Sequence, residues 1–208
     1  MLNVRRRKII LAGTLIPATG VIFAKQVDSN AIGCIQTEVG YSNLNNTTRF
    51  MVPRLYNPQI HGGFFRMVLD YPSMTPTMTE PGSPAWKTAL DIQVHGFPVN
   101  GTTADYIAAG KHTIRRAPDE GGYQVFLDRI NSNVDIKCYL YRDDFGNNVV
   151  LRNPPFDERV RLTHGFEKQF YFDCFFSKGL SDRFRDIDSK VSKLLLGFNR
   201  NSNALCSR

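Results

Sequence analysis

The fold is decided by residues 168–198, which read KQFYFDCFFSKGLSDRFRDIDSKVSKLLLGF. In the first part of this stretch apolar side chains recur at every second position, which is the period of a β-strand with one buried face. From residue 182 onward the apolar positions recur at intervals of three and four, as in an amphipathic helix. These positions are Phe184, Ile187, Val191, Leu194, Leu195 and Phe198. Because an apolar stripe needs an apolar partner, a strand followed by such a helix predicts a helix lying on a sheet.

Alternating segments earlier in the chain supply the rest of that sheet. Turn residues such as Gly121-Gly122 and those at 143–147 separate the segments at short intervals, which is typical of antiparallel hairpins. The segments predicted as strands are 64–71, 89–97, 123–130, 134–141, 149–152, 159–163 and 168–176, and a short helix is expected over 103–109. The sequence therefore predicts an α+β fold, mainly an antiparallel β-sheet with a C-terminal amphipathic helix packed on it.

The first 24 residues have the layout of a secretory signal. Basic residues occupy positions 5–8, positions 9–24 carry no charge, and polar residues follow at once. The uncharged run is shorter than the roughly 20 residues that a membrane-spanning helix requires. We expect cleavage after Ala24, a location outside the cytoplasm and a single mature domain over residues 25–208. An uncleaved N-terminal anchor is the alternative.

The net charge of the chain comes mostly from this N-terminal segment. The whole chain has 26 Lys and Arg against 19 Asp and Glu, a formal charge of +7. Without residues 1–24 the balance is 22 against 19, a charge of +3. So small a charge gives no reason to expect nucleic acid as a partner, and a membrane is expected only through an uncleaved N-terminal segment.

The cysteines predict disulfides rather than a metal site. Cys34, Cys138, Cys174 and Cys206 lack the Cys-x-x-Cys and Cys/His spacings of zinc sites. In an exported protein an even number of cysteines indicates disulfides. Cys138 and Cys174 both fall on the apolar side of their predicted strands, so we expect these two to pair, which leaves Cys34 for Cys206. The alternative is that Cys138 and Cys174 are reduced core residues.

No catalytic or cofactor motif is recognisable in the sequence. A nucleophile elbow, a P-loop and a GxGxxG sequence are all missing. The residues at 143–147 resemble a calcium loop but lack its closing Glu, since residue 154 is Pro, and a turn is expected there. Each histidine is expected on the surface or in a loop rather than as a ligand. The histidines are His61, His95, His112 and His164. We therefore expect neither an enzyme nor a cofactor.

Two short motifs carry a resemblance to a known family. The first is RFMVPRLY at 49–56, and the second is FRMVLDYPSMTP at 65–76. Together with residues 121–126, the strand of Cys174 and the terminal helix, they resemble the exported immunity proteins of bacterial type VI secretion systems that are paired with lipase effectors. The resemblance spans about residues 49–198. Many members of that family are lipoproteins, whereas this chain has no lipidation site at the end of its apolar run.

The resemblance implies a periplasmic protein that binds a toxic phospholipase delivered by neighbouring cells and blocks it by steric occlusion. It implies no catalytic residues. Exposed aromatic side chains are common anchors of such an interface. The candidates lie opposite the predicted core side of their strands, and they are Tyr139, Tyr141, Tyr171 and Phe175. The alternative is that a second layer covers these four rings.

Two other classes of function stay open at this point. One is a periplasmic adaptor or binding protein of a secretion apparatus. Gene neighbourhood separates it from an immunity protein, which should be encoded beside its effector. The other is a hydrolase with an unrecognised site, which requires convergent polar groups in a pocket.

Overall fold

The computed structural model describes residues 33–41, 46–79, 82–110, 114–131 and 134–200. The predicted signal over residues 1–24 lies outside these ranges, and so does Cys206, the expected partner of Cys34. Cleavage, export, the assignment of residues 25–208 to one domain and the second disulfide therefore stay predictions.

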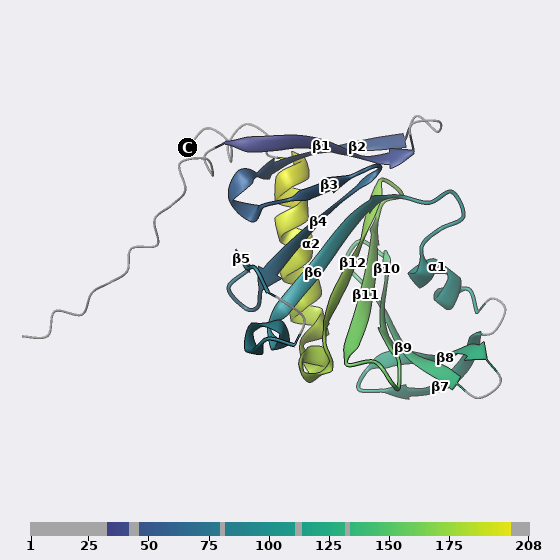
Figure 1. The fold of residues 1–208 in the computed structure, drawn as a ribbon. Coiled ribbons are helices and arrows are strands. Elements are labelled where there is room, and N and C mark those ends of the chain that lie inside the picture. The colour runs from purple at the N-terminus through teal and green to yellow at the C-terminus, as the bar shows by residue number, and fades with distance from the viewer. Residues whose placement is uncertain (1–32, 42–45, 80–81, 111–113, 132–133, 201–208) are drawn as a thin grey trace, which may run out of the picture.

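The described residues are organised around one large antiparallel sheet (Figure 1). Its strands are β3 (Gln59–His61), β4 (Phe64–Asp70), β5 (Thr75–Pro76), β6 (Ala89–Gly96), β7 (Ile114–Glu120), β8 (Tyr123–Asn131), β9 (Val134–Arg142), β10 (Asn148–Asn153), β11 (Arg159–Phe166) and β12 (Phe170–Ser177). The order is β3-β4-β6-β12-β11-β10-β9-β8-β7, with β5 paired to β4. A separate hairpin consists of β1 (Cys34–Tyr41) and β2 (Asn46–Pro53), and the helices are α1 (Thr103–Ala108) and α2 (Phe184–Arg200).

The strand register decides which side chains share a face of the sheet. Leu162 of β11 lies opposite Cys174 of β12 and beside Leu151 of β10, and all three belong to the main core. Because neighbouring residues on a strand point to opposite sides, Arg161 and Phe175 project the other way. We call the side of Leu162 and Cys174 the helix face, and the side of Arg161 and Phe175 the open face.

The helix face is covered by α2 and by the β1–β2 hairpin (Figure 1). The stripe of α2 contributes Phe184, Ile187, Val191, Leu195 and Phe198 to the core. From the hairpin, the Phe50 ring meets the rings of Phe65 and Phe170 edge-on, at centroid distances of 5.3 and 5.0 Å. Edge-to-face contact is a favoured geometry for aromatic pairs. The helix is therefore held by burial of one apolar stripe, as its sequence predicts.

The open face is covered only in part. A capping box between Thr102 and Asp105 begins α1, which places Ala104 and Ile107 over β9, β10 and β11. The apolar residues beneath the helix are Phe126, Ile136, Cys138, Leu140 and Val150. Over β4, β6 and β12 the open face instead carries half-buried charged and aromatic side chains.

The hairpin crosses the large sheet where a glycine leaves room for it. A Cβ atom at Gly96 would lie 2.2 Å from the Cα atom of Gly40 in β1. That separation is far below van der Waals contact. The backbone N–H of Gly40 donates to the carbonyl oxygen of Gly63 at 3.4 Å. The missing side chain at Gly96 is what allows β1 to approach β6 this closely.

The predicted fold class is confirmed, and most elements lie close to their predicted bounds. The predicted strands 64–71 and 89–97 correspond to β4 and β6. β11 extends beyond the predicted end at residue 163, because pairing with β12 continues to Phe166. Asp91 of β6 lies on the side of the strand opposite Leu90 and Ile92, and it is only 6% exposed because arginine side chains lie over it.

The predicted disulfide between Cys138 and Cys174 is wrong. Both thiols are free and buried. Cys138 projects from the open face into the cluster beneath α1, whereas Cys174 projects from the helix face into the main core. Each residue lies on an apolar side of its strand, but the two apolar sides belong to opposite faces. Burial raises the pKa of Cys138 to about 11 and that of Cys174 well above its ordinary value, so both are the reduced core residues of the alternative prediction.

Candidate functional site

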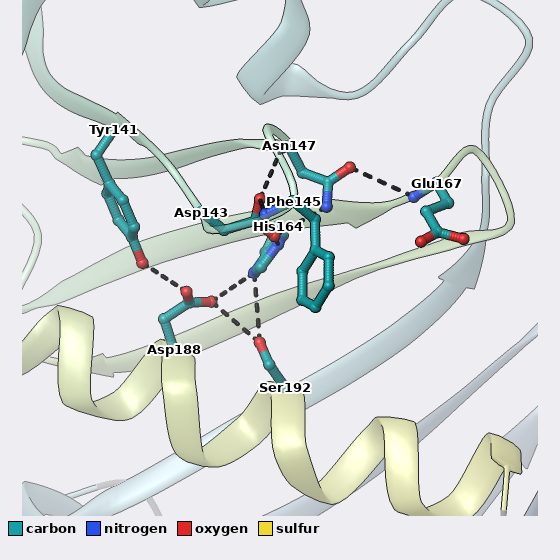
Figure 2. A network of polar contacts seen from close by, with 8 residues as sticks. All are labelled: Tyr141, Asp143, Phe145, Asn147, His164, Glu167, Asp188 and Ser192. Carbon is teal, nitrogen blue, oxygen red and sulfur yellow. Dashed lines mark hydrogen bonds and ion pairs between the residues drawn. The ribbon is translucent and has the colours of Figure 1, made fainter.

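A buried polar network beneath α2 is the candidate site (Figure 2). Its centre is His164 of β11, which is 2% exposed. Nδ1 of the ring lies 2.7 Å from Oδ1 of Asp188 in α2, and Nε2 lies 3.0 Å from Oδ2 of Asp143. A histidine can donate from both ring nitrogens, and here each nitrogen meets a carboxylate oxygen. The network therefore joins the helix, a central strand and a turn through one imidazole ring.

The turn between β9 and β10 holds Asp143 in position. Oδ1 of Asp143 accepts the backbone N–H groups of Phe145 at 3.0 Å and Asn147 at 2.7 Å, and Oδ2 accepts the Asn147 side-chain amide at 2.8 Å. Burial disfavours the ionised carboxylate, but the hydrogen bonds from Asn147 and the contact with His164 outweigh burial and lower the pKa of Asp143. The predicted turn at 143–147 is thus present, and it also aims a carboxylate at His164.

Asp188 connects α2 to the sheet from the other side of the ring. The Tyr141 hydroxyl of β9 donates to Oδ2 of Asp188. One helical turn further, Oγ of Ser192 lies 3.4 Å from Oδ1 of Asp188 and 3.3 Å from Nδ1 of His164. Burial and the carboxylate of Asp188 both raise the pKa of Tyr141, so the phenol stays protonated and can donate. Figure 2 shows Asp188 meeting Tyr141, His164 and Ser192 together.

The network contains a serine, a histidine and aspartates, but not in the arrangement of nucleophilic catalysis. In a Ser-His-Asp triad the serine and the carboxylate contact different ring nitrogens. Asp143 does lie at Nε2, but Nδ1, the nitrogen that Ser192 would need, is already occupied by Asp188, at 2.7 Å against 3.3 Å for Ser192. Ser192 also lies within a regular helix, where backbone N–H groups are bonded along the helix rather than aimed at a substrate oxygen. The geometry suits a brace that fastens α2 to the sheet.

A second polar group lies on the open face. Oδ1 and Oδ2 of Asp91 accept hydrogen bonds from Arg66 at 2.7 and 3.1 Å, and Arg159 lies 3.7 Å away. Asp173 accepts two hydrogen bonds from Arg161, at 2.8 and 2.6 Å. The two carboxylates are 6% and 3% exposed, since the arginine side chains cover them. Paired arginine–carboxylate forks of this kind are strong and fixed in geometry.

Aromatic rings form a stack beside these ion pairs on the open face. The rings belong to four adjacent strands, and successive centroids are 4.7, 5.0 and 4.9 Å apart. Burial lowers the pKa of His95, which favours the uncharged ring within the stack. The members in strand order are His61, Phe64, His95 and Tyr171. This part of the sheet therefore presents aromatic and arginine side chains together.

The four aromatic residues predicted to contact a partner lie on two different faces. Tyr139 and Tyr141 are on the helix face, partly buried against the main core, so a second layer covers them. Tyr171 and Phe175 are half-buried on the open face. The Phe175 ring lies 5.6 Å from the guanidinium carbon of Arg161. Tyr171 and Phe175 keep the position that a partner contact requires, and their role stays a prediction.

His164 and Asp188 are the residues that sequence reasoning missed. The predicted surface or loop position is wrong for His164, which continues the buried row of β11 between Leu162 and Phe166. Asp188 likewise lies on the buried side of α2 near Val191. A polar residue at an inward-facing position of a strand or helix is the signal that could have identified both, because buried polar groups need partners.

The described residues offer neither a metal site nor a membrane-spanning helix. Within them, no three His, Cys, Asp or Glu side chains are placed to hold a metal ion. No helix in the same part of the chain is both long and apolar enough to cross a bilayer.

Comparison with known proteins identifies a shared fold. No family model and no curated protein sequence matches the chain. Smlt3025, an immunity protein of the Stenotrophomonas maltophilia type IV secretion system, matches with a TM-score of 0.53 and 10% identity, over 80% of this chain and 93% of that one. FrpD, an iron-regulated outer membrane lipoprotein of Neisseria meningitidis, matches more weakly, with a TM-score of 0.46 and 9% identity over 79% of this chain and 92% of that one. At such identity the likeness to Smlt3025 shows a common fold alone.

Proposed function

We propose that this protein is an exported immunity protein, which binds a toxic secretion-system effector in the periplasm and blocks it without catalysis. The observation that carries the proposal is the fold shared with Smlt3025, itself an immunity protein of a secretion system. The layout of residues 1–24 supports export. The contacts of His164 support a bracing role for the network rather than chemistry on a substrate.

The finer form of the proposal assigns the effector to type VI secretion and to the phospholipases, and it rests on the sequence motifs. The apolar positions of those motifs include five residues of the core. Phe50, Val52, Phe65, Met67 and Leu69 are all fully or almost fully buried. The motifs therefore support a common fold more strongly than they identify a partner. Because Smlt3025 belongs to a type IV system, the fold alone does not select the type VI assignment.

The proposed mechanism is steric occlusion by a rigid surface. A preorganised surface loses little conformational entropy when it docks, so more of the contact energy appears as affinity. Here the long sheet and the His164 brace fix the backbone, and the forks of Arg66 and Arg161 fix side chains on the open face. Arginine and large aromatic residues are enriched among the side chains that dominate interface energies.

Coexpression in a sensitive host tests the immunity role. The effector encoded beside this gene is directed to the periplasm together with either the full chain or a chain that lacks residues 1–24. We expect growth with the full chain and killing with the shortened chain, at equal amounts by immunoblot. Rescue by the shortened chain would contradict a periplasmic site of action. Killing in the presence of the full chain would contradict the immunity role itself.

The reaction of the effector tests the finer assignment. Purified effector should release fatty acid from phosphatidylethanolamine vesicles, and one equivalent of this protein should stop the release. An effector that leaves the vesicles intact but cleaves peptidoglycan or nucleic acid would overturn the phospholipase assignment and leave the immunity role in place.

A further inference from the structure

A cavity on the solvent side of the His164 network is lined by three cations that have no carboxylate partner among the described residues. It has a volume of about 410 Å³ and lies between the β9–β10 turn and α2. Its exposed charged side chains are three cations, Arg142, Arg185 and Lys193, and one carboxylate, Asp144. None of the three cations makes an ion pair or a side-chain hydrogen bond with any residue that the structure describes. We call this opening the cationic cavity.

The buried acids of the cationic cavity are already engaged. Asp143 and Asp188 also line it, but their carboxylates face the two nitrogens of His164, and the hydroxyl of Tyr141 donates to Asp188. Their oxygens therefore face His164 and Tyr141 rather than the cations of the rim. Among the exposed side chains of the rim alone, three cations lie beside one carboxylate.

Two tyrosines hold Arg185 at the rim. Its guanidinium carbon lies 4.5 Å from the ring centroid of Tyr123 and 4.8 Å from that of Tyr141. Stacking on a ring leaves the N–H groups at the edge of the guanidinium plane open for two parallel hydrogen bonds to a carboxylate. Tyr141, Arg142 and Arg185 also line an adjoining cavity of about 580 Å³, so the positive surface continues toward β8.

Phe145 supplies an apolar contact beside these charges. It is 72% exposed and lines the cationic cavity together with Phe166 and Leu196. Its backbone is fixed, because its N–H donates to Asp143. Figure 2 shows the Phe145 ring projecting from the turn toward α2, beside the network. Phe145 and Arg185 thus line one cavity, and aromatic residues and arginine are both enriched at protein interfaces.

We propose that the cationic cavity receives an acidic segment of a partner protein, with a carboxylate of that segment paired to Arg185 and an apolar side chain against Phe145. This inference rests on the proposed function, since it assigns the surface and the chemistry by which the effector is held. Complementary charge favours an anionic occupant. A protein segment fits better than a lipid surface, because membrane recognition typically uses clusters of about four to eight basic residues.

Charge reversal at the rim tests the assignment. The double variant Arg142→Glu/Lys193→Glu is compared with Arg54→Glu/Lys87→Glu, which reverses two exposed cations outside the cavity. The probe is the purified effector encoded beside this gene, and its Kd is measured by calorimetry at low and at physiological salt. We expect the rim variant to weaken binding about tenfold or more and to reduce its salt dependence, and the control to stay within about twofold.

A further variant tests whether the planar guanidinium of Arg185 is needed for binding. Arg185→Lys keeps the charge but removes the planar donor pair, so we expect a smaller loss than in the rim variant but a clear one. Circular dichroism and the Tm of each variant show whether the fold is kept.

Each result of these measurements decides between the two proposals. Equal binding by wild type and both double variants would overturn the cavity assignment while leaving the immunity role intact. Failure of the wild type to bind the effector would overturn both. A separate measurement tests whether the wild type and the rim variant bind vesicles of phosphatidylglycerol and phosphatidylcholine. Vesicle binding that the rim variant loses, with effector binding unchanged, would assign the cavity to lipid and overturn the acidic-segment proposal.

Discussion

The two faces of the sheet hold their buried carboxylates in different ways. On the helix face, Asp188 and its partner His164 are 5% and 2% exposed beneath α2. On the open face, Asp173 is as buried, at 3%, but 32% of the Arg161 side chain stays exposed. When a carboxylate is removed, a partner that reaches water can be rehydrated, whereas a sealed partner cannot. The energetic weight of such a pair therefore depends on how far the partner is from water, not only on burial of the acid.

The largest effect is expected from Asp188→Ala. This change leaves His164 with one carboxylate and Tyr141 without its acceptor, and breaking a buried pair in this way costs about 3–5 kcal/mol. Urea unfolding at neutral pH measures the loss in the free energy of unfolding. Asp188→Asn is the matched control, because it keeps an acceptor for Tyr141 without the charge, and it should cost less. A loss no larger than that of Asp173→Ala on the open face would contradict the difference that we expect between the two faces.

A smaller effect is expected from Asp173→Ala on the open face. The change removes both hydrogen bonds to Arg161 and the one from Thr163 at 2.6 Å. Because Arg161 can turn to the solvent, we expect a loss of about 1.5–3 kcal/mol, the range for hydrogen bonds to a charged group. The same urea titration measures it. A loss equal to that of Asp188→Ala would show that access of Arg161 to water does not matter.

Acid should act on the helix face through Asp143. Its pKa is lowered in the folded protein, so its contribution is fully present above the unfolded value of about 3.9 and is lost as the pH falls through the lower folded value. We expect Asp143→Asn to be less stable than wild type at neutral pH but to lose less stability on acidification. Unfolding midpoints between pH 7 and pH 2 measure the difference. Parallel curves for the two proteins would contradict this role of Asp143.

The smallest effect is expected where neither charge is buried. Lys190 and Asp186 form an exposed pair one helical turn apart on α2, with 36% and 47% of their side chains exposed. Exposed pairs of this kind contribute about 0.5 kcal/mol or less. Lys190→Ala should therefore change the unfolding midpoint only slightly, and a shift approaching that of Asp173→Ala would show that exposure is a poor guide to the ranking.

The elements could be predicted from the sequence because their signals are local. The strand around Cys174 and the helix from Phe184 each repeat their own period within one segment, and the structure places both as expected. Short polar turns such as that at 143–147 follow the same local rules. Burial of a single periodic face explains why the fold class was accessible without any knowledge of strand order.

The faces and the site could not be predicted, because they depend on pairing across the sheet. Whether Cys138 and Cys174 share a side depends on the register of the strands between them, and the register places them on opposite faces. His164 meets Asp143 and Asp188 only once β11 lies beside β10 and α2 lies on the sheet. The spacing of residues along the sequence does not indicate which distant segments will be in contact.

The contact between Gly96 and Gly40 restricts which residues this fold tolerates at position 96. In a saturation library, position 96 should tolerate almost nothing but glycine, whereas Gly62, whose added Cβ would meet no atom within 4 Å, should accept many residues. Core hydrophobic residues can replace one another as long as volume is conserved. A steric contact of this kind therefore restricts the sequence at one position more tightly than packing restricts any single residue of the core.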